Sequence, residues 1–123
     1  MVNLTRLSIL ISCLLAVSLA WDQAHITGHF YCSVWGHKQW IPSSTHLSFW
    51  DKGRIFDNVV EEFDLDNKNQ TIDLVISNGI YGLNPYLTIT HYCNADNDQV
   101  KHVEKLKLGE NYLGNYDLAK ALN

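Results

Sequence analysis

The fold class of this chain is decided by the stretch Asn84-Pro85-Tyr86-Leu87-Thr88-Ile89-Thr90-His91-Tyr92-Cys93-Asn94. Its side chains alternate, so one face carries Leu87, Ile89, His91 and Cys93 while the other carries Tyr86, Thr88, Thr90 and Tyr92. β-Branched and aromatic residues favour extended backbone, and a proline is tolerated at the start or edge of a strand. The stretch therefore predicts a β-strand with a cysteine on its inward face.

Three further stretches alternate in the same way. Residues 24–33 place Ile26, Phe30 and Cys32 on one face, with Gly28 marking a bend or a close backbone approach. Residues 45–51 turn Leu47 and Phe49 inward and His46, Ser48 and Trp50 outward. Residues 71–77 turn Ile72, Leu74 and Ile76 inward and precede Asn78-Gly79, a strong hairpin signal.

The remaining stretches are less regular. Residues 58–63 and 100–108 are strand candidates, and the second has the charges typical of a protected sheet edge (Lys101, Glu104, Lys105, Lys107). We expect loops or turns at 33–43, 64–70 and 94–99, and the pattern over 109–123 is weak. Short strands at intervals of roughly ten residues predict an all-β, antiparallel β-sandwich.

The first twenty residues have the pattern of a secretory leader. Arg6 gives a positive start, residues 7–19 form a short apolar run, and Ser18-Leu19-Ala20 matches a signal-peptidase site. We predict a signal peptide over 1–20, cleavage between Ala20 and Trp21, and a secreted, extracellular domain over 21–123. An uncleaved membrane anchor is the alternative; the mature chain has no candidate transmembrane segment.

The net charge of the chain argues against two classes of binding partner. The sequence has 9 basic and 13 acidic residues, so losing Arg6 with the leader leaves a net charge of −5. No basic cluster stands out, which argues against nucleic acid and against purely electrostatic attachment to anionic lipid.

The cysteine count fits an oxidising compartment. Cys13 would leave with the leader, so Cys32 and Cys93 remain as an even pair, both on inward strand faces. A bridge between them would stabilise the fold by about 4 kcal/mol on the chain-entropy model.

Four segments, in this order, resemble the transthyretin-like family of secreted nematode proteins. They are Ile26-Thr27-Gly28-His29-Phe30-Tyr31-Cys32, Leu47-Ser48-Phe49-Trp50-Asp51, the stretch from Asn84 to Asn94, and Leu108-Gly109-Glu110-Asn111-Tyr112-Leu113-Gly114 followed by Tyr116-Asp117. The resemblance implies a prealbumin-type, Ig-like sandwich of two sheets and a Cys32–Cys93 bridge. It also implies a non-enzymatic binding role, without a cofactor, toward an extracellular protein, a lipid or a small hydrophobic ligand.

Two other functions are weighed against this one. A hormone carrier resembling transthyretin would need a homotetramer with a channel. Hydrolysis of 5-hydroxyisourate would need a site similar to that of a related sandwich, with His and Arg residues and a carboxyl-terminal Tyr-Arg-Gly-Ser. This chain instead ends Asp-Leu-Ala-Lys-Ala-Leu-Asn and has only Arg54 after the leader. We therefore expect no catalytic residues.

The metal-ligating residue types are poorly spaced for a site. His25 and His29 share a face but would lie roughly 13 Å apart along a strand, so His29 with His46 is the more reasonable zinc pair. We expect His91 to be a hydrogen-bonded core residue. Residues 64–69 look like a calcium loop superficially but lack its Gly and Glu, so no metal site is predicted.

Two surface features complete the predictions. Asn69-Gln70-Thr71 is an N-glycosylation sequon in a polar turn. Trp35 and Trp40, with His37 and Lys38 between them, are the candidate contact surface, because an apolar ring with a polar edge suits a partner. The alternative is that one or both rings fold back and cap the open end of the sandwich.

Overall fold

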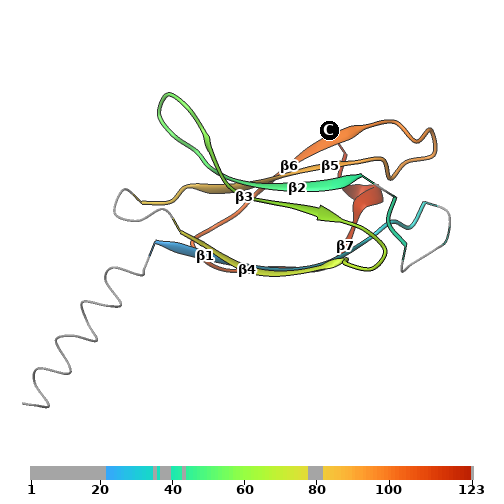
Figure 1. The fold of residues 1–123 in the computed structure, drawn as a ribbon, viewed down its shortest axis with the longest axis horizontal. Coiled ribbons are helices and arrows are strands. Elements are labelled where there is room, and N and C mark those ends of the chain that lie inside the picture. The colour runs from blue at the N-terminus through green and yellow to red at the C-terminus, as the bar shows by residue number, and fades with distance from the viewer. Residues whose placement is uncertain (1–21, 35, 37–39, 43, 78–81, 123) are drawn as a thin grey trace, which may run out of the picture.

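Two β-sheets pack face to face, as the two layers of Figure 1 show. The computed structural model describes residues 22–34, 36, 40–42, 44–77 and 82–122, and these ranges hold seven strands. One sheet has the order β4-β1-β7 and the other β3-β2-β5-β6. The strands are β1 (Gln23–Tyr31), β2 (Thr45–Asp51), β3 (Asn58–Leu65), β4 (Thr71–Ser77), β5 (Pro85–His91), β6 (Val100–Lys105) and β7 (Gly109–Asp117).

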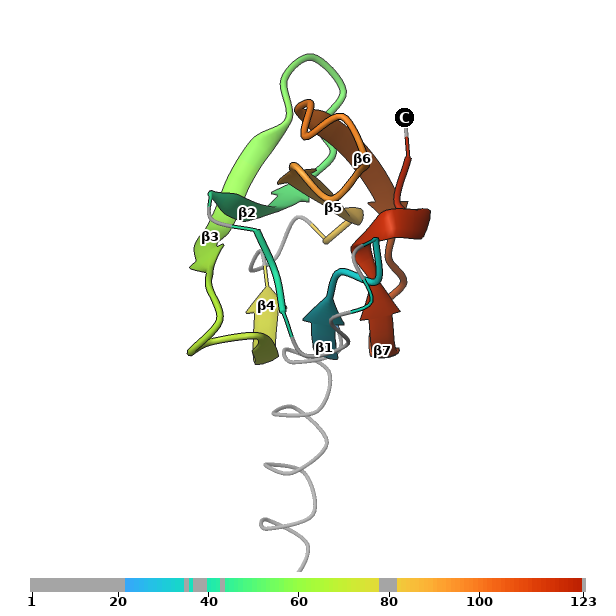
Figure 2. The same ribbon diagram turned by 90° about the vertical axis from the view of Figure 1, so that its right-hand side faces the viewer.

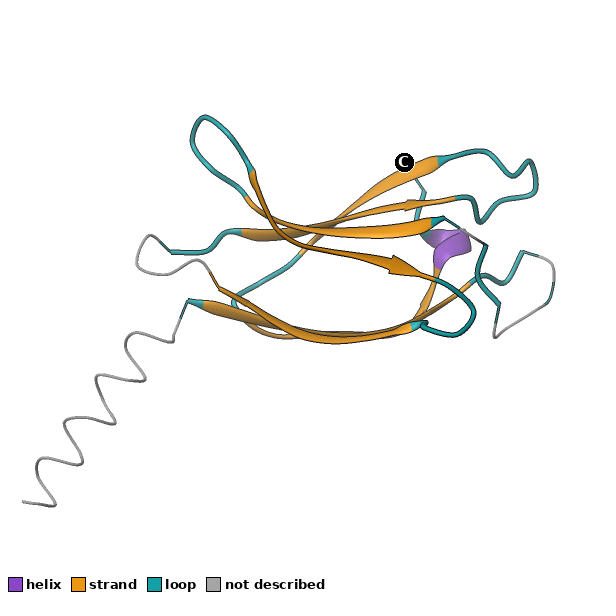
Figure 3. Ribbon diagram, in the orientation of Figure 1, coloured by secondary structure: helices purple, strands orange, loops and turns teal. Residues whose placement is uncertain are grey.

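The prediction of an all-β, two-sheet architecture is confirmed. Apart from the strands, the regular structure in the described ranges is one short 3-10 helix, Leu118–Lys120, which Figure 3 shows beside the sheets. None of the described helical structure is long and apolar enough to cross a bilayer. Residues 1–21, with the predicted cleavage between Ala20 and Trp21, lie outside the described residues.

The prediction of a wholly antiparallel sandwich is wrong at one pair. β1 and β7 run parallel, from Ala24 opposite Gly109 to Tyr31 opposite Asp117, with a register shift between Thr27 and Gly28. At the shift, a side chain on Gly28 would come within 3.0 Å of the Cβ of Leu113, so the close approach predicted for this glycine is present.

The strand β7 was missed because its first inward position is polar and its alternation is interrupted, although Leu113 and Tyr116 pack against the core. Asn111 is 8% exposed and uses its side chain on the preceding turn, where Oδ1 accepts from the Lys107 amide and Nδ2 donates to the Lys107 carbonyl. Gly114, at a φ of 63°, interrupts the alternation further. The hydrogen bonds of a polar turn thus take the place of hydrophobic contacts at this strand's start.

Three other strands also have boundaries that differ from those predicted from the sequence. β3 continues through Asp64 to Leu65, beyond the expected end at residue 63, because the turn narrows to a hairpin closed by a bridge between Asp66 and Asn69. β5 ends at His91 rather than Asn94. β6 lies at the edge of its sheet, as its charges predict, but ends at Lys105.

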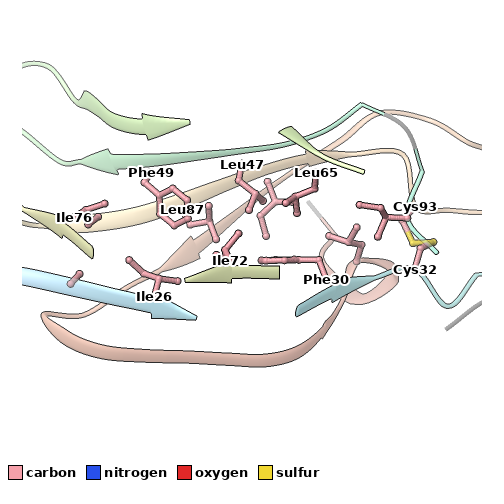
Figure 4. Packing of buried hydrophobic residues seen from close by; sticks show 14 of the residues in the cluster. Ile26, Phe30, Cys32, Leu47, Phe49, Leu65, Ile72, Ile76, Leu87 and Cys93 are labelled. Atoms are coloured by element: carbon pink, nitrogen blue, oxygen red, sulfur yellow. A yellow bond between two sulfur atoms is a disulfide. The ribbon is translucent and has the colours of Figure 1, made fainter. Parts of the chain in front are cut away.

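The hydrophobic core lies between the sheets (Figure 4). Most of the inward side chains that the alternation identifies are fully buried, from both layers: Ile26, Phe30, Leu47, Phe49, Leu87 and Ile89. Leu74, also predicted inward, is only partly buried against the core. Burial of each fully buried side chain contributes about 1.5–3 kcal/mol, which makes this interface the main stabilising element of the fold.

The disulfide between Cys32 and Cys93 is present, at the end of the core that Figure 4 shows. Cys32 follows β1 and Cys93 follows β5, and their Cα atoms are 5.8 Å apart. The bridge therefore joins the two sheets, as inward cysteines on separate strands require.

Candidate functional site

Two aromatic rings form a platform on the outer face of the four-stranded sheet. Trp50 of β2 lies opposite Tyr86 of β5, with ring centroids 5.9 Å apart and planes only 2° from parallel. The indole Nε1 donates to the Thr88 hydroxyl over 2.9 Å, and the Tyr86 hydroxyl donates to the carboxylate of Asp57. Because both polar groups have partners, the half-buried rings are held in a fixed orientation.

Asp57 ties the platform to the loop between β2 and β3. Its Oδ2 accepts from the Tyr86 hydroxyl, and its Oδ1 accepts from the Gly53 amide over 3.2 Å. Desolvation raises the pKa of Tyr86 to about 12, with the hydrogen bond to Asp57 as the second cause. The phenol is therefore a neutral hydrogen-bond donor at any physiological pH.

A cleft of about 410 Å³ opens beside Tyr86, between the ends of β5 and β6. Its apolar wall is made of Pro85, Val103 and Leu106, and Val103 is 56% exposed. Lys52 and Lys105 supply the two cations of the lining, and neither forms an ion pair with any residue in the described ranges. The cleft thus combines an apolar wall, an aromatic edge and two ammonium groups.

A larger cavity of about 580 Å³ lies near the turn between β6 and β7. Two of its polar side chains are already engaged, since Glu110 bonds His25 over 2.7 Å and Asn111 bonds the turn backbone. Lys105, which it shares with the cleft, Lys107 and the exposed Tyr112 also line this cavity. The cleft beside Tyr86 is the stronger candidate because it adjoins the fixed, stacked rings of Trp50 and Tyr86.

The outward histidines are bound to neighbours within their own sheets. His25 lies between Asp73, at 2.6 Å, and Glu110, at 2.7 Å, so it joins the three strands of its sheet. His46 contacts Asp64 at 2.7 Å and Glu62 at 3.3 Å. In both cases the hydrogen bond to an Asp carboxylate is the largest cause that raises the pKa of the imidazole.

The zinc pair of His29 and His46 is not formed. His29 lies on β1 and bonds the Thr71 hydroxyl at 2.9 Å, whereas His46 lies on β2 in the other sheet, and both side chains are on outward faces. Among the described residues, no group of three His, Cys, Asp or Glu side chains is arranged to hold a metal.

His91 is the hydrogen-bonded core residue that its strand position predicts. It is fully buried, its Nε2 donates to the Ala121 carbonyl over 2.8 Å, and its Nδ1 accepts from the Cys93 amide over 3.0 Å. Burial lowers the pKa of this imidazole, so the neutral form is favoured.

The predicted contact surface is described only at Trp40. That side chain is half-buried and packs against the hydrophobic core, and its backbone carbonyl accepts from the Cys32 amide over 2.7 Å. Trp35, His37 and Lys38 lie outside the described residues. Asn69 of the sequon is exposed at the end of the β3–β4 hairpin, where its backbone N–H donates to the Asp66 carboxylate.

Sequence reasoning missed the platform and the cleft. Trp50 and Tyr86 each stood on the outward face of a predicted strand, but their stacking depends on the pairing register of β2 with β5. Ile55 and Phe56 were also missed; their signal was an apolar pair separated by one residue, Arg54, from the turn at Lys52-Gly53.

Comparisons with known proteins add little to this geometry. No family model matches the chain, and no curated protein matches it. Among solved structures, a 9R-lipoxygenase from Cyanothece PCC8801 aligns with 14% identity and a TM-score of 0.39. The alignment covers 78% of this chain and 16% of the lipoxygenase, and so weak a likeness assigns neither fold family nor function.

Proposed function

We propose that this chain is a secreted, non-enzymatic binding protein of the transthyretin-like type. The observation that carries the binding role is the cleft beside Tyr86, where an apolar wall meets two lysines without an ion-pair partner in the described chain. A cleft of about 410 Å³ lies within the range that small-molecule sites occupy. The ligand class that fits is a small amphipathic anion.

Each part of such a ligand has a counterpart in the cleft. Its apolar body packs on Pro85, Val103 and Leu106. Its anionic group lies near Lys52 and Lys105, whose ammonium groups donate hydrogen bonds and accept none. Asp57, the carboxylate of the lining, is engaged by the Tyr86 hydroxyl and the Gly53 amide, which reduces its repulsion of the ligand.

Titration with 1-anilinonaphthalene-8-sulfonate tests the cleft, because this probe joins an aromatic body to a sulfonate. The double variant Lys52→Ala with Lys105→Ala should weaken binding by about 5- to 10-fold, since two partly solvated charge contacts are lost. Lys120→Ala removes an exposed lysine of the 3-10 helix and is the matched control. Equal affinities for all three proteins would rule out the cleft as the site.

The other parts of the proposal have their own measurements. The exported chain should begin at Trp21 in a mass spectrum, which tests the leader. Purified protein should leave the decay of 5-hydroxyisourate at its uncatalysed rate, whereas acceleration would show an enzyme. Light scattering gives the subunit number, and a tetramer would favour the carrier resembling transthyretin.

A further inference from the structure

The loop from Lys52 to Asp57 projects away from the four-stranded sheet, on the side opposite the three-stranded sheet (Figures 1 and 2). It joins β2 to β3 and carries two adjacent apolar side chains, Ile55 and Phe56, which are 83% and 79% exposed. These are the two most exposed large hydrophobic side chains of the described chain. Adjacent exposed apolar residues at a projecting tip indicate a contact with something outside the chain.

Two cations lie on the same loop. Lys52 and Arg54 are exposed, and neither forms an ion pair with a described residue. Lys105, which lines the cleft together with Lys52, adds a third positive charge near the base of the loop. The loop therefore combines an apolar tip with two cations on its amino-terminal side.

The carboxylates at the ends of this loop are held by protein donors. Asp51 is 7% exposed, and its Oδ1 accepts from the Asn84 amide over 2.8 Å. Asp57 accepts from the Gly53 amide and from the Tyr86 hydroxyl. These acids anchor the loop to the sheet, and its cations are left facing solvent.

The base of the loop is closed by a close backbone contact. A Cβ atom on Gly53 would lie 2.0 Å from the Phe56 carbonyl oxygen, so the backbone of the two residues is in close contact. With Asp57 bonded to Gly53 at the same place, Ile55 and Phe56 are presented outward.

We propose that this tip docks on the surface of an anionic lipid bilayer. Ile55 and Phe56 enter the boundary between headgroups and acyl chains, while Lys52 and Arg54 contact lipid phosphates. A protein partner is less suited, because a stable interface needs roughly 800 Å² on each side and a convex tip of two side chains offers far less. A bilayer accepts such a point by local insertion.

The net charge of the chain agrees with insertion rather than simple attraction. The whole sequence carries −4, so the molecule as a whole is repelled by an anionic surface, whereas Lys52 and Arg54 of this loop are attracted to it. Docking therefore requires both components, the apolar pair for insertion and the cations for orientation. It goes beyond the cleft and does not depend on a ligand there.

Co-sedimentation with phosphatidylcholine vesicles containing about 30% phosphatidylserine tests the proposal, because such vesicles present an anionic surface. The wild-type chain should sediment with these vesicles, and Ile55→Ser with Phe56→Ser should weaken the partitioning by about 100-fold. Lys52→Ala with Arg54→Ala should weaken it by about 30-fold on the anionic vesicles and much less on pure phosphatidylcholine.

Val75→Ser is the matched control, because Val75 is an apolar side chain of β4, 58% exposed, in the other sheet. It should leave partitioning unchanged. Wild-type protein that stays in the supernatant would overturn the proposal, as would an Ile55→Ser, Phe56→Ser double variant that sediments like wild type. The same double variant should still bind 1-anilinonaphthalene-8-sulfonate, so failure of docking and failure of the cleft are separate results.

Discussion

The Nε2 atom of His91 donates a hydrogen bond to the carbonyl oxygen of Ala121 over 2.8 Å. His91 belongs to β5 of the larger sheet, and Ala121 caps the 3-10 helix that follows β7 of the smaller sheet. The buried imidazole also accepts from the amide of Cys93, one of the two bridged cysteines. One side chain therefore fixes the last described turn of the chain to the interior of the sandwich, beside the disulfide.

Replacing His91 by Leu should lower the free energy of unfolding by about 2–4 kcal/mol, because two backbone groups lose their buried partner. The Cys93 amide and the Ala121 carbonyl are the two groups concerned. Urea unfolding followed by tryptophan fluorescence measures the change. His29→Leu, which removes one hydrogen bond at an exposed position, is the control and should change stability far less. Equal losses would contradict the anchoring role.

The acidic limb of the stability curve should depend on His91. Its pKa is lowered by burial, so its contribution is present above pH 6.5 and is lost as pH falls through the folded-state pKa. The His91→Leu variant should show a flatter decline in melting temperature below pH 6.5 than wild type does. A slope identical to that of wild type would assign the acid sensitivity to other groups.

His25 should act in the opposite direction. Asp73 and Glu110 raise its pKa, so the stability it contributes is present below pH 6.5 and is lost as pH rises through the raised value. His25→Ala should remove this decline on the alkaline side. The imidazole resonances, followed by NMR across this range, should titrate above the ordinary histidine value, and normal titration would show that the two ion pairs do not form in solution.

Opening the disulfide should lower the free energy of unfolding by about 4 kcal/mol, since the bridge closes a long loop of the unfolded chain. Cys32→Ala with Cys93→Ala, unfolded in guanidinium beside the oxidised parent, gives the value. Dithiothreitol should reduce the parent to the stability of the double variant and should leave the variant itself unchanged. A parent that keeps its stability although thiol titration shows both cysteines reduced would show that the sheets do not need the bridge.

Tyr86 should remain protonated well into alkaline solution, because desolvation and Asp57 raise its pKa to about 12. The absorbance of tyrosinate at high pH, compared between wild type and Tyr86→Phe, isolates this residue. The difference between the two proteins should appear near pH 12. A difference centred on the ordinary tyrosine pKa, about 10, would mean that the phenol is neither desolvated nor held by Asp57 in solution.

The inward residues of the core could be predicted because alternation acts within one strand. Leu47, Phe49, Leu87 and Ile89 are fully buried where the period of two placed them. β7 could not be predicted, because Asn111 fills an inward position by hydrogen bonding and the parallel pairing with β1 joins segments far apart in the sequence.

The candidate site could not be predicted, because it depends on how strands pair with one another, which the sequence of a single strand does not show. The stacking of Trp50 on Tyr86 follows from the register of β2 with β5, and the cleft needs β6 beside them. The tryptophan loop shows a further difference, since the described ring, Trp40, packs against the core. The aromatic side chains of this loop suggested a contact surface, but whether a ring such as Trp40 is buried depends on the path of the loop backbone.

The parallel pairing of β1 with β7 has a consequence for biosynthesis. His25 binds Glu110, a partner 85 positions later, so the smaller sheet stays incomplete until its final strand has left the ribosome. During that interval one edge of β1 has backbone groups without strand partners, and such an edge can pair with another chain. The order of synthesis thus makes β7 the segment that closes the molecule.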